Sequence, residues 1–368
     1  MSIINLLKFK KQSAAVSLFV VIFATLLITI VTVSFARIMI KGQQQATTID
    51  LSQSAYDSAL AGVEDAKRAL LRYQSICDSG GDCSLAKDKI ESKTCNEAIN
   101  TLKDVEYSNE EVKIQTDSSN LLDQAYTCVK INLNTIDYLG SLAKDESDFI
   151  PLKGVSDFDR IKIEWFNLED AGSTGIVGLI SPVGTIPLPA TWSAKPPILK
   201  TQMIQFGDNF RLDDFDNDEG STDSLFLYPS RTGASNVSFV SDKHQTPSNS
   251  PLRIDCDSDI SSGGYSCSAT IMVNSSMDNK FLRLSSIYNK TNYRITLLNG
   301  SNIVEFNSVQ PEVDSTGRTN DMFRRVKSRV ELNTNFPYPE ATIDVTGNLC
   351  KDFIITNNVK YYSNSCEP

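Results

Sequence analysis

The chain has 368 residues with 35 basic and 45 acidic side chains, and its net charge is −10 at pH 7. This balance excludes nucleic acid as the expected partner, because affinity for a phosphate backbone comes mainly from Lys and Arg. The length is ample for a buried core and is typical of more than one domain.

The first predicted element is a membrane-spanning helix. Three closely spaced lysines precede an uncharged, mostly apolar segment over residues 12–36. This segment can cross a hydrocarbon core of about 30 Å, which takes about 20 helical residues. It is longer than the apolar core of a cleaved secretory signal, about 7–15 residues, and no glycine or proline interrupts it before Gly42. We expect a basic leader over residues 1–14 and the transmembrane half of a long helix over residues 15–41.

One face of this segment carries small and hydroxylated residues at helical spacing, namely Thr25, Thr29, Thr32 and Ala36. Such residues let helices approach closely in lipid and hydrogen-bond to one another, so this face is a candidate helix-packing surface. The alternative is that each threonine hydroxyl bonds to the backbone of its own helix. The residues alone favour neither alternative.

An amphipathic pattern follows over residues 42–74. Apolar residues recur there every three or four positions, at Tyr56, Leu60, Val63, Ala66, Leu70 and Tyr73. We expect this second half of the helix to pack on a β-sheet through Tyr56, Leu60, Val63 and Leu70. A coiled coil is the alternative, although the pattern is short for one.

The N-terminal region resembles a known family. The segments QSAAVSLFVVIFATLLITIVTVSFARIM and SAYDSALAGVEDAKRALL, with the basic leader before them, are similar to the N-terminal region of type IV pilins and of the pseudopilins of type II secretion. The similarity is to PilX-like and GspK-like minor pilins in particular, and it extends to about residue 75. It implies a membrane-inserted precursor whose long helix becomes the spine of an exported head.

By position, the resemblance implies that a prepilin peptidase cuts between Ala14 and Ala15, where the family normally has glycine before the cut. Cleavage after Ser13 is the alternative. Counted from Ala15, the fifth residue is Phe19, whereas major pilins have a glutamate there that is thought to pair with the N-terminal amine of a neighbouring subunit. A missing glutamate resembles the minor pseudopilin that caps the filament tip.

The resemblance therefore implies a minor subunit of a type IV pilus-like filament, located at the tip or priming assembly, with adhesion as a further role. Its partners would be other pilin subunits, the assembly platform, the prepilin peptidase and the membrane. The head would lie outside the cytoplasmic membrane and on the cell surface after assembly. The alternatives are a membrane-anchored surface adhesin that never polymerises and a minor pseudopilin of type II secretion.

Residues 75–145 are predicted to form a largely helical insertion. They contain four cysteines and no proline, and they include the runs LAKDKIESKTCNEAINTLKD and SSNLLDQAYTCVKINLNTI. The pair Gly80-Gly81 predicts a tight loop at the start of the insertion.

Alternating patterns predict a β-rich head over residues 146–335. RIKIEWF, SLFLYPS, KFLRLSSIY and VKSRVEL are predicted strands, and YRITLLNGSNIVEF is predicted as strand–turn–strand with Asn-Gly at its bend. With the spine helix, these strands predict an α+β fold with a mainly antiparallel head. Residues 336–368 are expected to form a disulfide-closed tail that protects an edge strand.

All eight cysteines follow the apolar segment: Cys77, Cys83, Cys95, Cys128, Cys256, Cys267, Cys350 and Cys366. An even number on one side of a membrane favours disulfides in an exported part. Proximity favours Cys256 with Cys267 and Cys350 with Cys366, which leaves the first four to pair among themselves. Zinc is disfavoured because the ligand spacing is absent. The charges that flank the helix favour a cytoplasmic N-terminus only slightly.

The densest acidic cluster, LDDFDNDEGSTDS, is a candidate calcium site with Asp214, Asp216, Asp218 and Asp223 as ligands. Its spacing departs from that of an EF-hand loop, and a solvated acidic loop is the alternative. Catalysis has little support, since the chain has a single histidine, His244, and no zinc-protease, nucleotide-binding or nucleophile-elbow motif. We therefore expect no enzyme.

Overall fold

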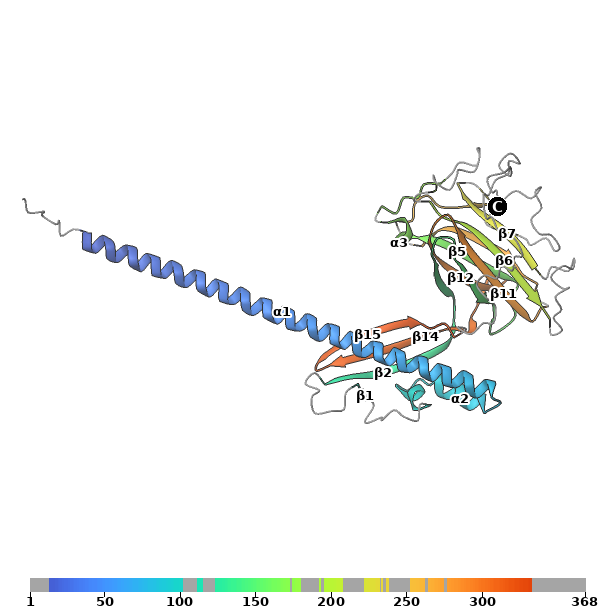
Figure 1. The fold of residues 1–368 in the computed structure, drawn as a ribbon, viewed down its shortest axis with the longest axis horizontal. Helices are drawn as coiled ribbons and strands as arrows, with labels where there is room; N and C mark the ends of the chain where they lie inside the picture. The colour runs from blue at the N-terminus through green and yellow to red at the C-terminus, as the bar shows by residue number, and fades with distance from the viewer. Residues whose placement is uncertain are drawn as a thin grey trace, which may run out of the picture. The chain divides into compact units, whose positions relative to one another are not determined.

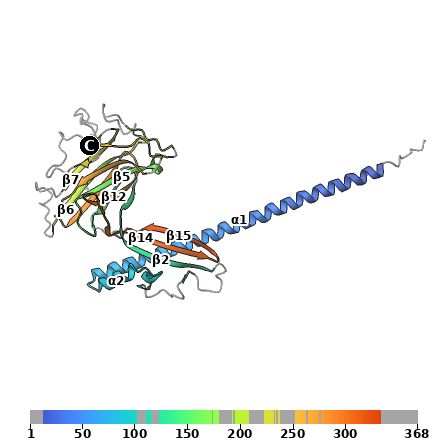
Figure 2. The ribbon, with the colours of Figure 1, turned by 180° about the vertical axis from the view of Figure 1, so that it is seen from behind.

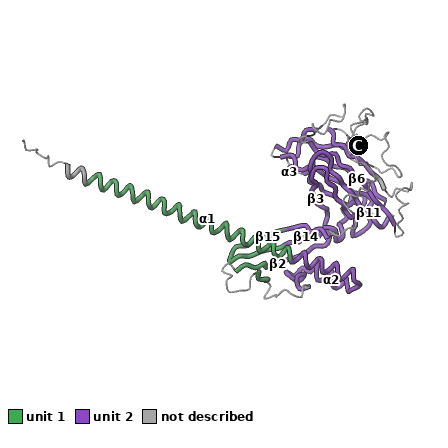
Figure 3. The backbone as a smooth tube through the Cα atoms, viewed as in Figure 1, with its two compact units in different colours: residues 1–64, 104–128, 315–326 green, residues 65–103, 129–314, 327–368 purple. Residues whose placement is uncertain are grey.

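The computed structural model describes residues 13–101, 111–114, 123–172, 174–179, 192, 195–207, 222–231, 233, 236–237, 252–261, 264–274 and 277–332. The chain divides into two compact units, which are coloured separately in Figure 3. Unit 1 contains residues 1–64, 104–128 and 315–326, and unit 2 contains residues 65–103, 129–314 and 327–368.

A single long helix, α1 (Ser13–Asp78), begins the fold (Figure 1). The chain has no proline before Pro151, so nothing removes a backbone donor within these 66 residues. The helix ends where Gly80 adopts a φ of 75° and the N–H of Gly81 donates to the carbonyl of Ile76 at 2.9 Å. This is the bond pattern with which a glycine commonly ends a helix. The predicted helix and the loop at Gly80-Gly81 are confirmed.

α1 packs against a four-stranded sheet with the order β1-β2-β14-β15 (Figures 1 and 2). The strands are β1 (Val112–Lys113), β2 (Gln124–Thr135), β14 (Phe306–Thr319) and β15 (Met322–Arg329). Of this sheet, β1, residues 124–128 of β2, 315–319 of β14 and 322–326 of β15 belong to unit 1. Ser54 of the helix accepts hydrogen bonds from Gln124 of β2 and, at 3.2 Å, from Thr319 of β14. Helix and sheet are thus joined by polar contacts on two strands.

Small residues make a further part of this interface. Ala55, Ser58 and Ala59 are completely buried. A Cβ atom on Gly317 of β14 would overlap the backbone of Ala55 and Ala59, so the strand and the helix approach each other through a residue without a side chain. The close approach therefore depends on Gly317.

The predicted packing stripe is wrong for two of its four residues. Val63 and Leu70 are buried as expected, but Tyr56 is 42% exposed and Leu60 is 37% exposed. Successive helical residues are rotated by about 100°, so when Ala55 and Ala59 face the sheet, the larger residues that follow them point away. A close backbone approach selects the small side chains, whereas the prediction had selected the large ones.

Unit 2 contains two sheets that share one hydrophobic core. The first has the order β13-β12-β5-β10-β8, with β3 beside β12; its strands are β3 (Tyr138–Leu142), β5 (Arg160–Asn167), β8 (Asn236–Val237), β10 (Tyr265–Met272), β12 (Thr291–Asn299) and β13 (Asn302–Val304). The second has the order β4-β11-β6-β7-β9; its strands are β4 (Ser147–Pro151), β6 (Ile198–Phe206), β7 (Thr222–Ser230), β9 (Leu252–Asp255) and β11 (Asn279–Ile287).

The core lies between the inward faces of these sheets. Ile163 and Trp165 of β5, Ile295 of β12 and Leu282 and Leu284 of β11 are all completely buried within it. Within each of the two sheets, neighbouring strands pair in an antiparallel direction, except that the pairings β10–β8 and β7–β9 are parallel. The predicted α+β class and the mainly antiparallel head are confirmed, in the form of a β-sandwich.

The predicted helical insertion over residues 75–145 is partly wrong. α2 (Cys83–Ile90) and the short 3-10 helix Glu97–Thr101 are helical, but β2 and β3 occupy residues 124–142. Along β2, the side chains of Val129, Ile131 and Leu133 are buried, and the residues between them are not. This period of two is typical of a strand and was missed in a segment rich in polar residues. A further short helix, α3 (Leu168–Ala171), follows β5.

Disulfides join Cys77 to Cys83 and Cys256 to Cys267, the second as sequence proximity predicted. Cys95 and Cys128 are also disulfide-bonded. Cys350 and Cys366 lie outside the described residues. The framework expected for the exported part is therefore present in that portion of the chain that the structure describes.

The close approach at Gly317 predicts the effect of a single methyl group. Gly317→Ala should lower the free energy of unfolding by about 1–3 kcal/mol, because the backbone of α1 must move away from β14. Urea unfolding of the detergent-solubilised protein measures this loss. The control is Gly207→Ala, where a Cβ would meet no atom within 4 Å, and it should change stability by less than about 0.5 kcal/mol. Equal stability of the two variants would contradict the close approach.

Candidate functional site

The N-terminal half of α1 has an apolar surface that a soluble domain would not leave exposed. Every large apolar side chain between Leu18 and Ile40 is exposed, with fractions from 43% to 75%. The helix reaches a mean hydropathy of 2.7 and is long and apolar enough to cross a membrane. Over the described part of the chain, the structure thus supports one membrane-spanning helix, near the N-terminus.

These side chains cannot remain in water at no cost. Each one gains roughly 1.5–3 kcal/mol when it leaves water. Residues 18–36 carry no charge and at 1.5 Å per residue they extend over about 28 Å, close to the thickness of a hydrocarbon core. Lipid, or the apolar segments of other helices, is therefore the environment that this surface requires.

The candidate helix-packing residues have their hydroxyl groups satisfied within the helix. Thr25 donates to the carbonyl of Ile22 at 2.9 Å, and Thr29 donates to that of Leu26 at 2.8 Å. Thr32 donates to the carbonyl of Ile28 at 2.6 Å. Each threonine hydroxyl thus bonds to the backbone of its own helix, which was the alternative to bonding with a second helix. Ala36 and the threonine methyl groups are left as the outward surface of that face.

The predicted processing site lies at the start of α1. Ala14 and Ala15 are in its first turn, and Phe19 follows one turn later with 71% of its surface exposed. The helix therefore already contains the residues that would become the new N-terminus.

The candidate calcium ligands Asp214, Asp216 and Asp218 lie outside the described residues, and Asp223 is placed in β7 only by its backbone. Within the described ranges, no group of three or more His, Cys, Asp or Glu side chains is arranged to hold a metal ion. The calcium prediction stays a prediction.

The two tryptophans belong to the interior of unit 2. Trp165 is completely buried and donates from Nε1 to the carbonyl of Pro197 at 3.2 Å. Trp192 is 2% exposed and donates to the carbonyl of Pro196 at 2.9 Å. Neither ring is open to a sugar or another ligand.

An ion-pair cluster fixes the sheet on which α1 packs. Arg318 of β14 contacts Glu111 at 2.7 Å and Asp123 at 2.9 Å, and only 15% of its side chain is exposed. Hydrogen bonding and the positive charge of Arg318 lower the pKa of Asp123 below its ordinary value. Gly317, the neighbour of Arg318 in β14, is the residue that meets the helix.

The sequence predicted the buried residues Val63, Ala66 and Leu70 of α1 but not the small residues that precede them, although a signal was present. Small residues recur at helical spacing at Ala55, Ala59, Gly62 and Ala66, and all four are buried. Gly317, the partner of Ala55 and Ala59, could not be identified from the sequence because it lies more than 250 residues further along the chain.

Comparisons with protein-family models, with curated protein sequences and with solved structures found no match to this chain.

The Arg318 cluster predicts a pH dependence of stability. Asp123 has a lowered pKa in the folded protein, so its stabilising contribution is complete above its ordinary pKa and is lost as the pH falls through the lowered one. Arg318→Met should therefore cost about 1 kcal/mol at pH 7 and less at pH 2–3. Thermal unfolding across this pH range measures the difference. The exposed pair of Lys327 and Glu312 provides the control Lys327→Met, which should have little effect at pH 7. A cost for Arg318→Met that does not change with pH would contradict the assignment.

Proposed function

We propose that this protein is a minor subunit of a type IV pilus-like filament, located at the tip or in the complex that primes assembly. The observation that carries the proposal is the division of α1 into two halves within one unbroken helix. Its first half exposes apolar side chains from Leu18 to Ile40, and its second half is fixed to a sheet from Ser52 onward.

Such a helix suits a subunit that changes its surroundings. Before assembly, the apolar half lies in the membrane and holds the protein there. After assembly, the same half packs among the corresponding helices of other subunits, so its surface leaves lipid without entering water. The Ser52 hydroxyl accepts a 2.7 Å hydrogen bond from Arg324, and Ser54 is bonded to the same sheet. The part of the sheet in unit 1 therefore moves together with the helix when a subunit is extracted.

The resemblance to minor pilins adds the location within the filament. In that reading, the mature protein begins at Ala15 and has Phe19 in place of the glutamate that pairs with the N-terminal amine of a neighbour. A subunit without this carboxylate does not need a partner for it in an apolar surrounding, where an unpaired charge is costly. This supports a terminal subunit or a priming subunit over one that repeats along the fibre.

One observation favours a second function, a surface-binding protein that stays anchored in the membrane and never polymerises. The hydroxyl groups of Thr25, Thr29 and Thr32 are bonded within their own helix, so they do not require a second helix for their hydrogen bonds. A minor pseudopilin of type II secretion would have the same single-chain architecture as a pilus subunit.

Processing of the leader separates a pilus-type subunit from a plain anchor. N-terminal sequencing of the membrane-extracted protein should give Ala15 as the first residue. Ala14→Leu should block the cut and remove the protein from sheared filaments. The matched control is Ala24→Leu, which makes the same change inside the apolar segment, and its N-terminus should still be Ala15. An intact Met1 in the exported wild-type protein would support the plain anchor and contradict the proposal.

A further inference from the structure

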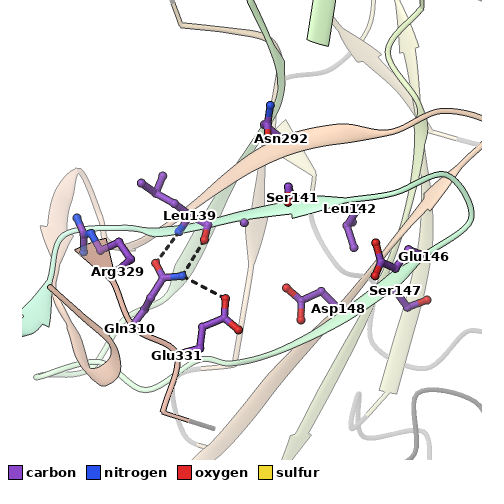
Figure 4. A pocket seen from close by; sticks show the side chains of 11 residues that line it. Leu139, Ser141, Leu142, Glu146, Ser147, Asp148, Asn292, Gln310, Arg329 and Glu331 are labelled. Atoms are coloured by element: carbon purple, nitrogen blue, oxygen red, sulfur yellow. Dashed lines mark hydrogen bonds between the residues drawn. The ribbon is translucent and has the colours of Figure 1, made fainter. Parts of the chain in front are cut away.

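A pocket of about 520 Å³ lies in unit 2 along the outer edge of β3 (Figure 4). Its walls include Ser141 of β3, Asp148 of β4, Gln310 of β14, and Glu331, which follows β15. A second hollow of about 650 Å³ shares Ser141 and three other lining residues with the first and is also lined by Lys144 and Lys290. A groove therefore follows the edge of the strand past Ser141.

The edge of β3 is capped on one side of Ser141 by a side chain that imitates a strand. Gln310 accepts a 2.9 Å hydrogen bond from the N–H of Leu139 and donates a 2.7 Å bond to the carbonyl of the same residue, as Figure 4 shows. The amide thus forms the pair of bonds that a neighbouring strand would form. On the other side of Ser141, the N–H of Ala143 donates to the Glu146 carboxylate at 2.6 Å.

Between these two caps, the backbone of Ser141 faces the groove. Strand residues two apart point their N–H and C=O groups to the same side, so Ser141 points away from β12 as Leu139 does. The pairing of β3 with β12 agrees with this direction. Asn292 lies opposite Ser141 in β12, and its N–H donates to Asp170 at 2.8 Å and not to Ser141. Within the described ranges, no residue occupies the outward N–H and C=O of Ser141. As far as the described residues go, one peptide unit of the edge is left open to a ligand.

Two carboxylates beside this open unit lie against buried tyrosines. The Tyr293 hydroxyl donates to Asp148, and Glu331 accepts a 3.4 Å bond from Gln310 and lies close enough to Tyr138 to act on the pKa of its hydroxyl. The tyrosines are 0% and 3% exposed, and burial raises the pKa of both, with the charge of Asp148 adding to the effect. They therefore remain protonated donors. A Cβ on Gly140 would overlap the Tyr293 ring, so glycine at this place lets the ring lie under β3.

The charge of the first hollow is negative. Glu146, Asp148 and Glu331 line it, and Arg329 is its basic lining residue. One nitrogen of the Arg329 guanidinium, Nη2, lies 3.1 Å from Asp137 and 3.7 Å from Glu312, whereas Nη1 is buried without a hydrogen-bond partner among the described residues. Its charge is thus compensated within the protein, and the three carboxylates are left to attract a cation.

We propose that this groove binds an extended peptide segment of a partner protein that carries a lysine or arginine side chain. The backbone of the peptide pairs with the N–H and C=O of Ser141, as in the addition of a strand to a sheet edge. The basic side chain enters the first hollow, where Asp148 and Glu331 receive it in fixed positions. The groove and the charge together select this occupant. A neutral strand would bring no positive charge to the carboxylates, and a small amine would form no strand-like hydrogen bonds with the backbone of Ser141.

The test is a binding titration with the full-length protein in detergent micelles at low ionic strength, so its result does not depend on filament assembly. The probe is a fluorescently labelled, acetylated and amidated pentapeptide, Ala-Val-Lys-Val-Ala, followed by anisotropy. We expect binding with a Kd of about 1 mM or below. Replacing the lysine of the peptide by norleucine, or changing Glu331→Gln in the protein, should weaken binding about tenfold.

Variants at Ser141 test the strand pairing. Ser141→Pro removes the outward N–H, and proline is tolerated where an edge strand faces away from its neighbour. This variant should weaken binding about tenfold, whereas Ser141→Ala keeps the N–H and should stay within about twofold of the wild type. Near-ultraviolet circular dichroism checks that both variants fold. The proposal is overturned if the peptide does not bind, if the norleucine peptide binds equally well, or if n-butylamine competes at the concentration at which the lysine peptide does.

Discussion

The contact between α1 and β14 at Gly317 is the constraint on which the rest of unit 1 depends. Only a residue without a side chain allows the strand to reach the helix backbone at Ala55 and Ala59. At that separation, the Ser54 hydroxyl accepts hydrogen bonds from side chains of both β2 and β14. The helix is therefore held by packing and polar contacts together, and its direction relative to the sheet of unit 1 is fixed over several turns.

A helix held in this way has consequences for its other half. Residues 18–40 extend beyond the sheet as a continuous apolar surface, and the hydrophobic effect requires that lipid or other helices cover it. Because the same helix includes both halves, a force on the apolar half is transmitted to the sheet through the bonds of one backbone. A flexible tether in place of the helix would not transmit force in this way.

The sequence predicts those features of the fold that local periodicity determines. The unbroken helix follows from a proline-free N-terminal region, and strands such as β5 and β12 follow from alternation and from the Asn-Gly turn after Leu298. The predictions from sequence are wrong where a contact between residues far apart in the chain determines which side chains are buried. Tyr56 and Leu60 have the larger apolar surface, yet the glycine at position 317 turns the small residues toward the sheet.

The groove beside β3 was equally out of reach of sequence reasoning. Its carboxylates Asp148 and Glu331 come from β4 and from the segment after β15, and they lie against two tyrosines that look like ordinary core residues in the sequence. Residues 124–142 were predicted as helix because polar side chains obscure the alternation of Val129, Ile131 and Leu133. The groove and the strands in residues 124–142 were missed for the same physical reason. In both places the partner strand determines which side chains are buried, more than the residue type does.

The measurement that tests the account most directly is the distance between spin labels on the two halves of α1. Labels at Ser34 and Gln53, in protein reconstituted into lipid nanodiscs, include the region where the helix leaves its apolar part and meets the sheet. A continuous helix with 1.5 Å per residue predicts a narrow distribution, centred about 28 Å apart between the backbone positions. A broad distribution with shorter distances would show a break between the halves and would contradict the account.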